Sequence, residues 1–186
     1  MRKLIIVIMS LACTNGHAQL LKQLAPDPAF TQAITTIVSD YPHNYRNIQG
    51  EEIEGTGNAS LFKSTVKLPG SDQCMIYRFN SIEDSTASWQ AIVYKGDSYT
   101  EAARIYRNTF RAVQRSRVNT NMLTAGFMGK MEAPTEDLRF TSSTLRLGTH
   151  DENYKNFVAE VEMINNYDGW EVHLNMHYKR DDDQKY

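Results

Sequence analysis

The feature that most constrains the fold is the alternation of apolar residues with polar or smaller ones in two segments near the C-terminus. The apolar positions of the first are Phe157, Ala159, Val161 and Met163, and those of the second are Trp170, Val172, Leu174, Met176 and Tyr178. Successive side chains of a β-strand point to opposite faces, so each segment predicts a strand with one buried face. Residues 166–169, Asn-Tyr-Asp-Gly, predict a short loop and therefore an antiparallel pair.

The register of this pair follows from its apolar residues. Residues directly opposite each other share a face, so Met163 is expected opposite either Val172 or Trp170. In the first register, Glu162 lies opposite His173 on the polar face of the sheet.

A helix is predicted over residues 98–115, because Ser98 and Glu101 form the S-x-x-E pattern of a capping box. At about 100° per residue, one arc of this helix is apolar and predicts a core face: Tyr99, Ala102, Ala103, Tyr106, Phe110 and Val113. A separate arc collects Arg104, Arg107, Arg111 and Arg115. Guanidinium groups recognise carboxylates and anionic surfaces, so these four arginines are the candidate binding residues. The alternative is an ordinary solvated helix face.

An earlier helix is predicted from Asp27, an N-cap residue, and Pro28, which suits the first helical position. Its apolar stripe ends before Pro42, which stops a helix: Phe30, Ile34, Ile37 and Tyr41.

Between the two helices, apolar residues recur at every second position, which predicts strands near 62–68, 73–79 and 89–94 and a weaker edge strand at 47–54. The segment 118–137, rich in Asn, Thr, Gly and Met, predicts a long mobile loop. Three strands follow that loop, and the acidic end from Asp181 is expected to be disordered.

The predicted fold class is α+β, with the order α-β-β-β(β)-α-β-β-β. We expect an antiparallel sheet of about six or seven strands with both helices packed on one face. This order resembles a loose duplication of a helix-then-meander unit.

Residues 1–18 predict a cleavable signal peptide. Arg2 and Lys3 form the positive region, and an uncharged, mostly apolar run of nine residues from Leu4 follows. A bilayer span needs about 20 apolar residues, so no membrane anchor is expected. The predicted cleavage lies between Ala18 and Gln19 and leaves one soluble domain, residues 19–186, in the periplasm or outside the cell. Attachment of a lipid at Cys13 is the less favoured alternative.

The mature chain would carry one thiol, Cys74, and hence no internal disulfide. We interpret Cys74 as a small buried residue of a strand. Without residues 1–18 the chain has 18 Lys and Arg against 22 Asp and Glu, a net charge of −4. This mild acidity argues against nucleic acid as a partner.

No cofactor or metal site is predicted, because serine-hydrolase elbows, phosphate loops, zinc spacings and dinucleotide fingerprints are absent from the sequence. His173 and His177 would lie about 13 Å apart along a strand, too far to share one metal ion. His43 and His150 lie in turn-like segments and are interpreted as surface residues.

The sequence therefore favours an exported binding or interaction module without catalysis, whose partner is an unknown protein or an anionic component of the cell envelope. Its candidate surfaces are the arginine stripe, the polar face of the sheet and the 118–137 segment. The alternative is an enzyme whose acid and base, such as Glu162 and His173, come from distant residues.

Overall fold

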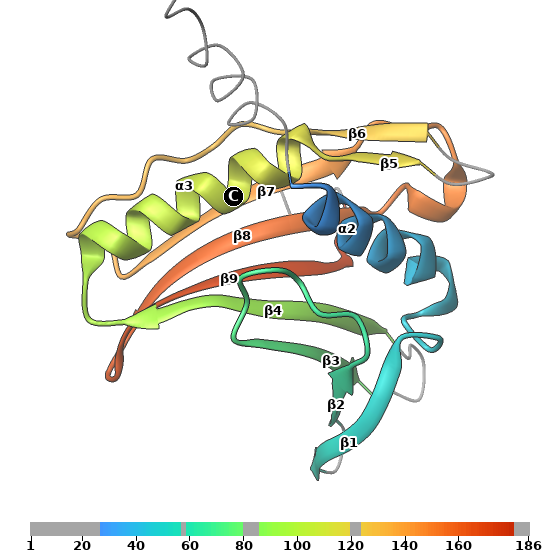
Figure 1. Ribbon diagram of the computed structural model, residues 1–186, viewed down its shortest axis with the longest axis horizontal. Coiled ribbons are helices and arrows are strands. Elements are labelled where there is room, and N and C mark those ends of the chain that lie inside the picture. The colour runs from blue at the N-terminus through green and yellow to red at the C-terminus, as the bar shows by residue number, and fades with distance from the viewer. Residues whose placement is uncertain (1–26, 57–58, 80–85, 120–123, 181–186) are drawn as a thin grey trace, which may run out of the picture.

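The computed structural model describes residues 27–56, 59–79, 86–119 and 124–180 (Figure 1). The described residues form helices α2 (Pro28–Asp40) and α3 (Tyr99–Arg115), the short 3-10 helices η1 (Tyr41–His43) and η2 (Glu152–Tyr154), and one antiparallel sheet. Its strands are β1 (Gln49–Thr56), β2 (Ala59–Ser64), β3 (Gln73–Phe79), β4 (Ala87–Gly96), β5 (Arg117–Asn119), β6 (Thr124–Met128), β7 (Phe140–Leu147), β8 (Phe157–Asn166) and β9 (Gly169–Tyr178). The fold class is α+β, as the sequence predicts. The signal segment 1–18 with Cys13 and the acidic end from Asp181 lie outside the described residues.

The strands run as two meanders that meet in the middle of the sheet. The sheet order is β1-β2-β3-β4-β9-β8-β7-β6-β5, so each meander starts at one edge and runs inward. The last strands of the two meanders, β4 and β9, pair antiparallel. One helix precedes each meander, so the helix-then-meander order occurs twice along the chain.

The described sheet has nine strands rather than six or seven, and the difference lies in the segment expected to be a loop. β5 and β6 are only three and five residues long, too short for a visible alternation among Asn, Thr and Gly. Val118, Ala125 and Phe127 nevertheless point into the core. Gly126 leaves room for its neighbour, because a β-carbon there would collide with the guanidinium of Arg117. Residues 129–139 that follow contain no helix or strand.

Both helices lie against one face of the sheet and share a core with it (Figure 1). α2 buries Ile34 and Ile37, and α3 buries Tyr106 and Phe110. β4, β8 and β9 contribute alternate residues to the same core, including the fully buried Trp89. No helix of the described chain covers the opposite face, which we name the open face.

The ends of α2 follow from its sequence. The Asp27 carboxylate accepts a hydrogen bond from the Ala29 N–H at 3.0 Å, as its N-cap position predicts. At the other end, the buried Asp40 carboxylate accepts hydrogen bonds from the backbone N–H groups of Asn47 and Ile48, at 3.0 and 3.2 Å. These bonds fix the chain between α2 and β1.

The register of β8 and β9 is the first of the two predicted alternatives. Met163 lies opposite Val172, and Glu162 lies opposite His173. Met163 and Val172 are both fully buried on the helix side, as either of the two registers requires.

Candidate binding surfaces

The four arginines predicted as binding residues lie on the side of α3 that faces away from the sheet. Arg104, Arg111 and Arg115 are exposed and Arg107 is half-buried. Arg104 pairs with a carboxylate of its own helix, because its Nε donates a hydrogen bond to Glu101 at 2.9 Å. Among the described residues, no carboxylate lies within ion-pair distance of the other three guanidinium groups. We name Arg107, Arg111 and Arg115 the free stripe.

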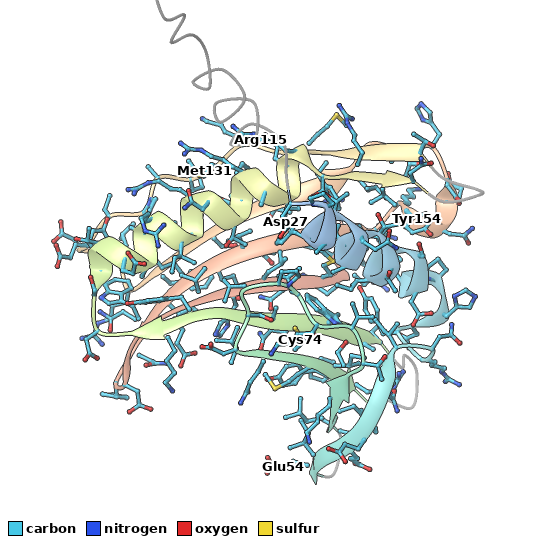
Figure 2. The ribbon with its side chains drawn as sticks, viewed as in Figure 1. Asp27, Glu54, Cys74, Arg115, Met131 and Tyr154 are labelled. Atoms are coloured by element: carbon cyan, nitrogen blue, oxygen red, sulfur yellow. The ribbon has the colours of Figure 1, made fainter. Side chains whose placement is uncertain are left out.

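The segment 129–139 runs along one side of α3. The Tyr99 hydroxyl donates to the Pro134 carbonyl at 2.8 Å, and the Gln114 side chain donates to the Gly129 carbonyl at 3.1 Å. Figure 2 shows Met131 of this segment beside α3, on the same side of the molecule as Arg115. The segment also carries exposed carboxylates at Glu132, Glu136 and Asp137. Lys130 and Arg139 of the same segment are exposed as well, so the segment beside α3 carries charges of both signs.

A network of ionisable side chains occupies the centre of the open face, on β7, β8 and β9. Glu160 accepts hydrogen bonds from the Ser142 hydroxyl at 2.7 Å and from the Lys179 ammonium at 3.1 Å, and the His177 ring lies 3.5 Å away. Burial opposes ionisation of Glu160, but these hydrogen bonds and the positive charges outweigh it and lower its pKa. Burial lowers the pKa of His177, and the charge of Lys179 adds to this effect while Glu160 opposes it.

Glu162 and His173, the predicted acid–base pair, lie opposite each other on β8 and β9. Their side chains, however, form hydrogen bonds with other residues. The His173 ring lies 2.9 Å from the Glu171 carboxylate on its own strand, and Glu162 accepts a hydrogen bond from the Asn175 amide at 2.6 Å. Burial raises the pKa of Glu162, and repulsion from Glu160 raises it further. Neither Glu162 nor His173 lines any of the pockets described below.

The other two histidines of the described residues, His43 and His150, are exposed, as the sequence predicts. Within the described residues, no three His, Cys, Asp or Glu side chains are placed to hold a metal ion.

Cys74 is half-buried rather than buried as expected, and it is a free thiol. Its Sγ accepts a hydrogen bond from the Leu68 N–H at 3.3 Å and lies 3.2 Å from the Ser71 hydroxyl, so it supports the loop between β2 and β3. Figure 2 shows Cys74 next to this loop.

A pocket of about 440 Å³ lies beside the same loop, and its lining includes Ile53 of β1, Leu61 of β2 and Met75 of β3. Sequence reasoning missed it because three strands and a loop combine to form it. The available signal was that Leu61 and Met75 are apolar residues on the face opposite Phe62 and Ile76. Smaller pockets of about 230 and 220 Å³ lie near η1 and η2, and a third, of about 140 Å³, borders His177.

No protein-family model, curated protein or solved structure matches the chain. None of the described helices combines the length and the apolar character needed to span a bilayer.

Proposed function

We propose that this chain is an exported, non-catalytic binding module that attaches through the free stripe of α3 to an acidic surface of a partner protein. The observation that carries the proposal is that Arg107, Arg111 and Arg115 share one outward helix face without a carboxylate partner among the described residues. From Arg107 to Arg115 the helix rises about 12 Å, a length that fits several carboxylates on a partner. Guanidinium groups bind carboxylates through two parallel hydrogen bonds, which adds geometric specificity.

The mixed charge around the stripe favours a protein over a membrane as the partner. The neighbouring segment has three exposed carboxylates, Glu132, Glu136 and Asp137, against two exposed cations, and these carboxylates would be repelled by a uniformly anionic lipid surface. A protein surface can instead place carboxylates opposite the arginines and basic groups opposite this segment.

Charge reversal of the stripe tests the proposal. We expect Arg107→Glu with Arg111→Glu to weaken partner binding by roughly tenfold, because like charges would then face each other across the interface. The control, Arg46→Glu with Lys155→Glu, makes the same change in net charge at two exposed positions away from α3 and should bind normally. Thermal unfolding should confirm that both variants fold.

The measurement is quantitative recovery of cross-linked partners from the cell envelope, followed by titration of the purified partner at low and high salt. Unchanged recovery with the stripe variant would overturn the proposal. Flotation with vesicles that contain anionic phospholipid forms a second arm, and stripe-dependent binding to those vesicles alone would replace the protein partner with a membrane.

Export is tested separately by the intact mass of the released protein. Cleavage after Ala18 predicts a chain that begins at Gln19. A mature chain that retains Cys13 with an added lipid mass would instead assign the protein to the lipid-anchored class.

A further inference from the structure

The pocket beside the β2–β3 loop has an apolar side formed by the open face of the sheet. Lys63 pairs with Met75 and Leu61 pairs with Tyr77, so alternation places these residues on the face away from Phe62 and Ile76 of the core. Met75 is buried, yet it does not belong to the main core cluster. Its thioether adapts readily to irregular apolar ligands.

Ile53 extends this apolar side from the edge strand. A break in the β1–β2 register lies between Glu52 and Glu54, so two residues of β1 face one residue of β2, and Ile53 lines the pocket. Ile53 is 48% exposed, which is unusual for a large apolar residue in this chain. The volume of about 440 Å³ lies within the range of small-molecule sites, and its size together with this exposed apolar side suits one alkyl chain.

The rim of the pocket carries two charged groups of opposite sign. Lys67 and Asp72 both line it and both are exposed. Among the described residues, neither side chain has a hydrogen bond or an ion pair. The third charged lining residue, Lys63, is already paired with Glu51. Within the described part of the chain, the rim therefore presents one cation and one anion without an ion-pair partner, beside the apolar side of the pocket.

We propose that this pocket binds a single-chain zwitterionic amphiphile of the alkylphosphocholine type. The alkyl chain packs on Ile53, Leu61 and Met75, the anionic phosphate lies near Lys67, and the quaternary ammonium lies near Asp72. An amphiphile with a single charge would satisfy only one of the two rim groups and would be repelled by the other. This site is independent of the α3 stripe, so either proposal can fail without the other.

A head-group series with one alkyl tail tests the proposal on the full mature chain. Decylphosphocholine, decyl sulfate and decyltrimethylammonium are titrated by calorimetry below their critical micelle concentrations. We expect the zwitterion to bind most tightly to the unmodified protein. No saturable binding, or an equal affinity for all three head groups, would overturn the proposal.

Reciprocal charge reversals give the sharpest result. Lys67→Glu should lower the affinity for decyl sulfate by about two- to fivefold and raise the affinity for decyltrimethylammonium. Asp72→Lys should have the opposite effects, of the size expected for exposed ion pairs. Lys155→Glu is the matched control away from the pocket and should change none of the affinities. If the two reversals do not shift the preference between decyl sulfate and decyltrimethylammonium in opposite directions, Lys67 and Asp72 do not form the head-group site.

The apolar side is tested through the tail. Leu61→Ser should lower the affinity for all three compounds by about tenfold, because apolar contact area is lost whatever the head group. If Leu61→Ser does not fold, Ile53→Ser at the exposed edge serves the same purpose with a smaller effect. An unchanged affinity in a folded variant would place the tail elsewhere.

Discussion

Two carboxylates two residues apart on β8 have opposite pKa shifts because their neighbours differ. Glu160 is compensated by Ser142, Lys179 and His177, which lower its pKa although burial opposes this. Glu162 has one amide donor, and burial and the charge of Glu160 raise its pKa above the usual 4.5. On the open face, the surroundings of Glu160 therefore favour its ionised form, whereas those of Glu162 disfavour its ionised form.

The pH dependence of Glu162 follows from the sign of its shift. A raised folded-state pKa means that the native chain holds the proton more tightly than the unfolded chain. The ionised carboxylate therefore costs native stability at neutral pH, and this cost disappears once the pH falls below 4.5, the ordinary value.

Glu162→Gln should remove that cost, because the glutamine carbonyl still accepts the Asn175 hydrogen bond. We expect a gain of about 0.5 kcal/mol in the free energy of unfolding at neutral pH, typical of pair interactions on a sheet face. The gain should vanish in acid, where the unmodified Glu162 is protonated. Urea titrations across this pH range measure it, with the exposed Glu54→Gln as control. A loss of stability at neutral pH would show that the charged form is favourable.

At the scale of elements, the start of α3 shows half of the predicted capping box. The Ser98 hydroxyl accepts a hydrogen bond from the Glu101 N–H at 3.3 Å, whereas the Glu101 carboxylate turns to Arg104. Ser98→Ala should therefore cost about 1 kcal/mol of stability, the usual value of an N-cap. Glu101→Gln should cost clearly less, because its charge is solvent-exposed. Thermal unfolding of the two variants measures this difference, and equal losses would indicate a reciprocal box in solution.

Long elements with local signals were predictable from the sequence. α2 and α3 have N-cap residues and one apolar stripe each, β8 has apolar residues at every second position from Phe157 to Met163, and β9 has them from Trp170 to Tyr178. β5 and β6 were not predictable from the sequence, because strands this short depend on pairing partners that the sequence does not identify. Tertiary pairing, rather than local preference, decides their structure.

The candidate surfaces were predictable to different depths. Helical periodicity placed the four arginines on one face, and the burial pattern of α3 agrees with that periodicity. The opposition of Glu162 and His173 was also correct, but their hydrogen-bond partners depend on side-chain rotamers and neighbouring strands. The pocket with Ile53 depends on an irregularity in β1, which no periodic pattern reports.

At the scale of the whole molecule, the two helix-then-meander halves, 28–96 and 99–178, share one core. Residues of both halves form a single cluster, with Trp89 from the first and Leu174 from the second fully buried. β4 and β9 pair over most of their length across the boundary. α2, which belongs to the first half, packs against β5 of the second. Without the other half, each half would therefore expose part of its hydrophobic core to solvent.

This shared core predicts that the halves unfold together, and the two tryptophans of the chain report on one half each. Trp89 is fully buried in β4, and its indole N–H donates to the Ser64 hydroxyl at 2.9 Å. Trp170 of β9 packs edge-on against Tyr99, with ring centres 5.3 Å apart. In Trp170→Phe and in Trp89→Phe, the fluorescence of the remaining tryptophan should have the same denaturation midpoint as the far-ultraviolet circular dichroism of that variant. Comparison within each variant removes the effect of the substitution on stability. A fluorescence midpoint that differs from the dichroism midpoint in either variant would mean that the β4–β9 pairing joins two independently folding units.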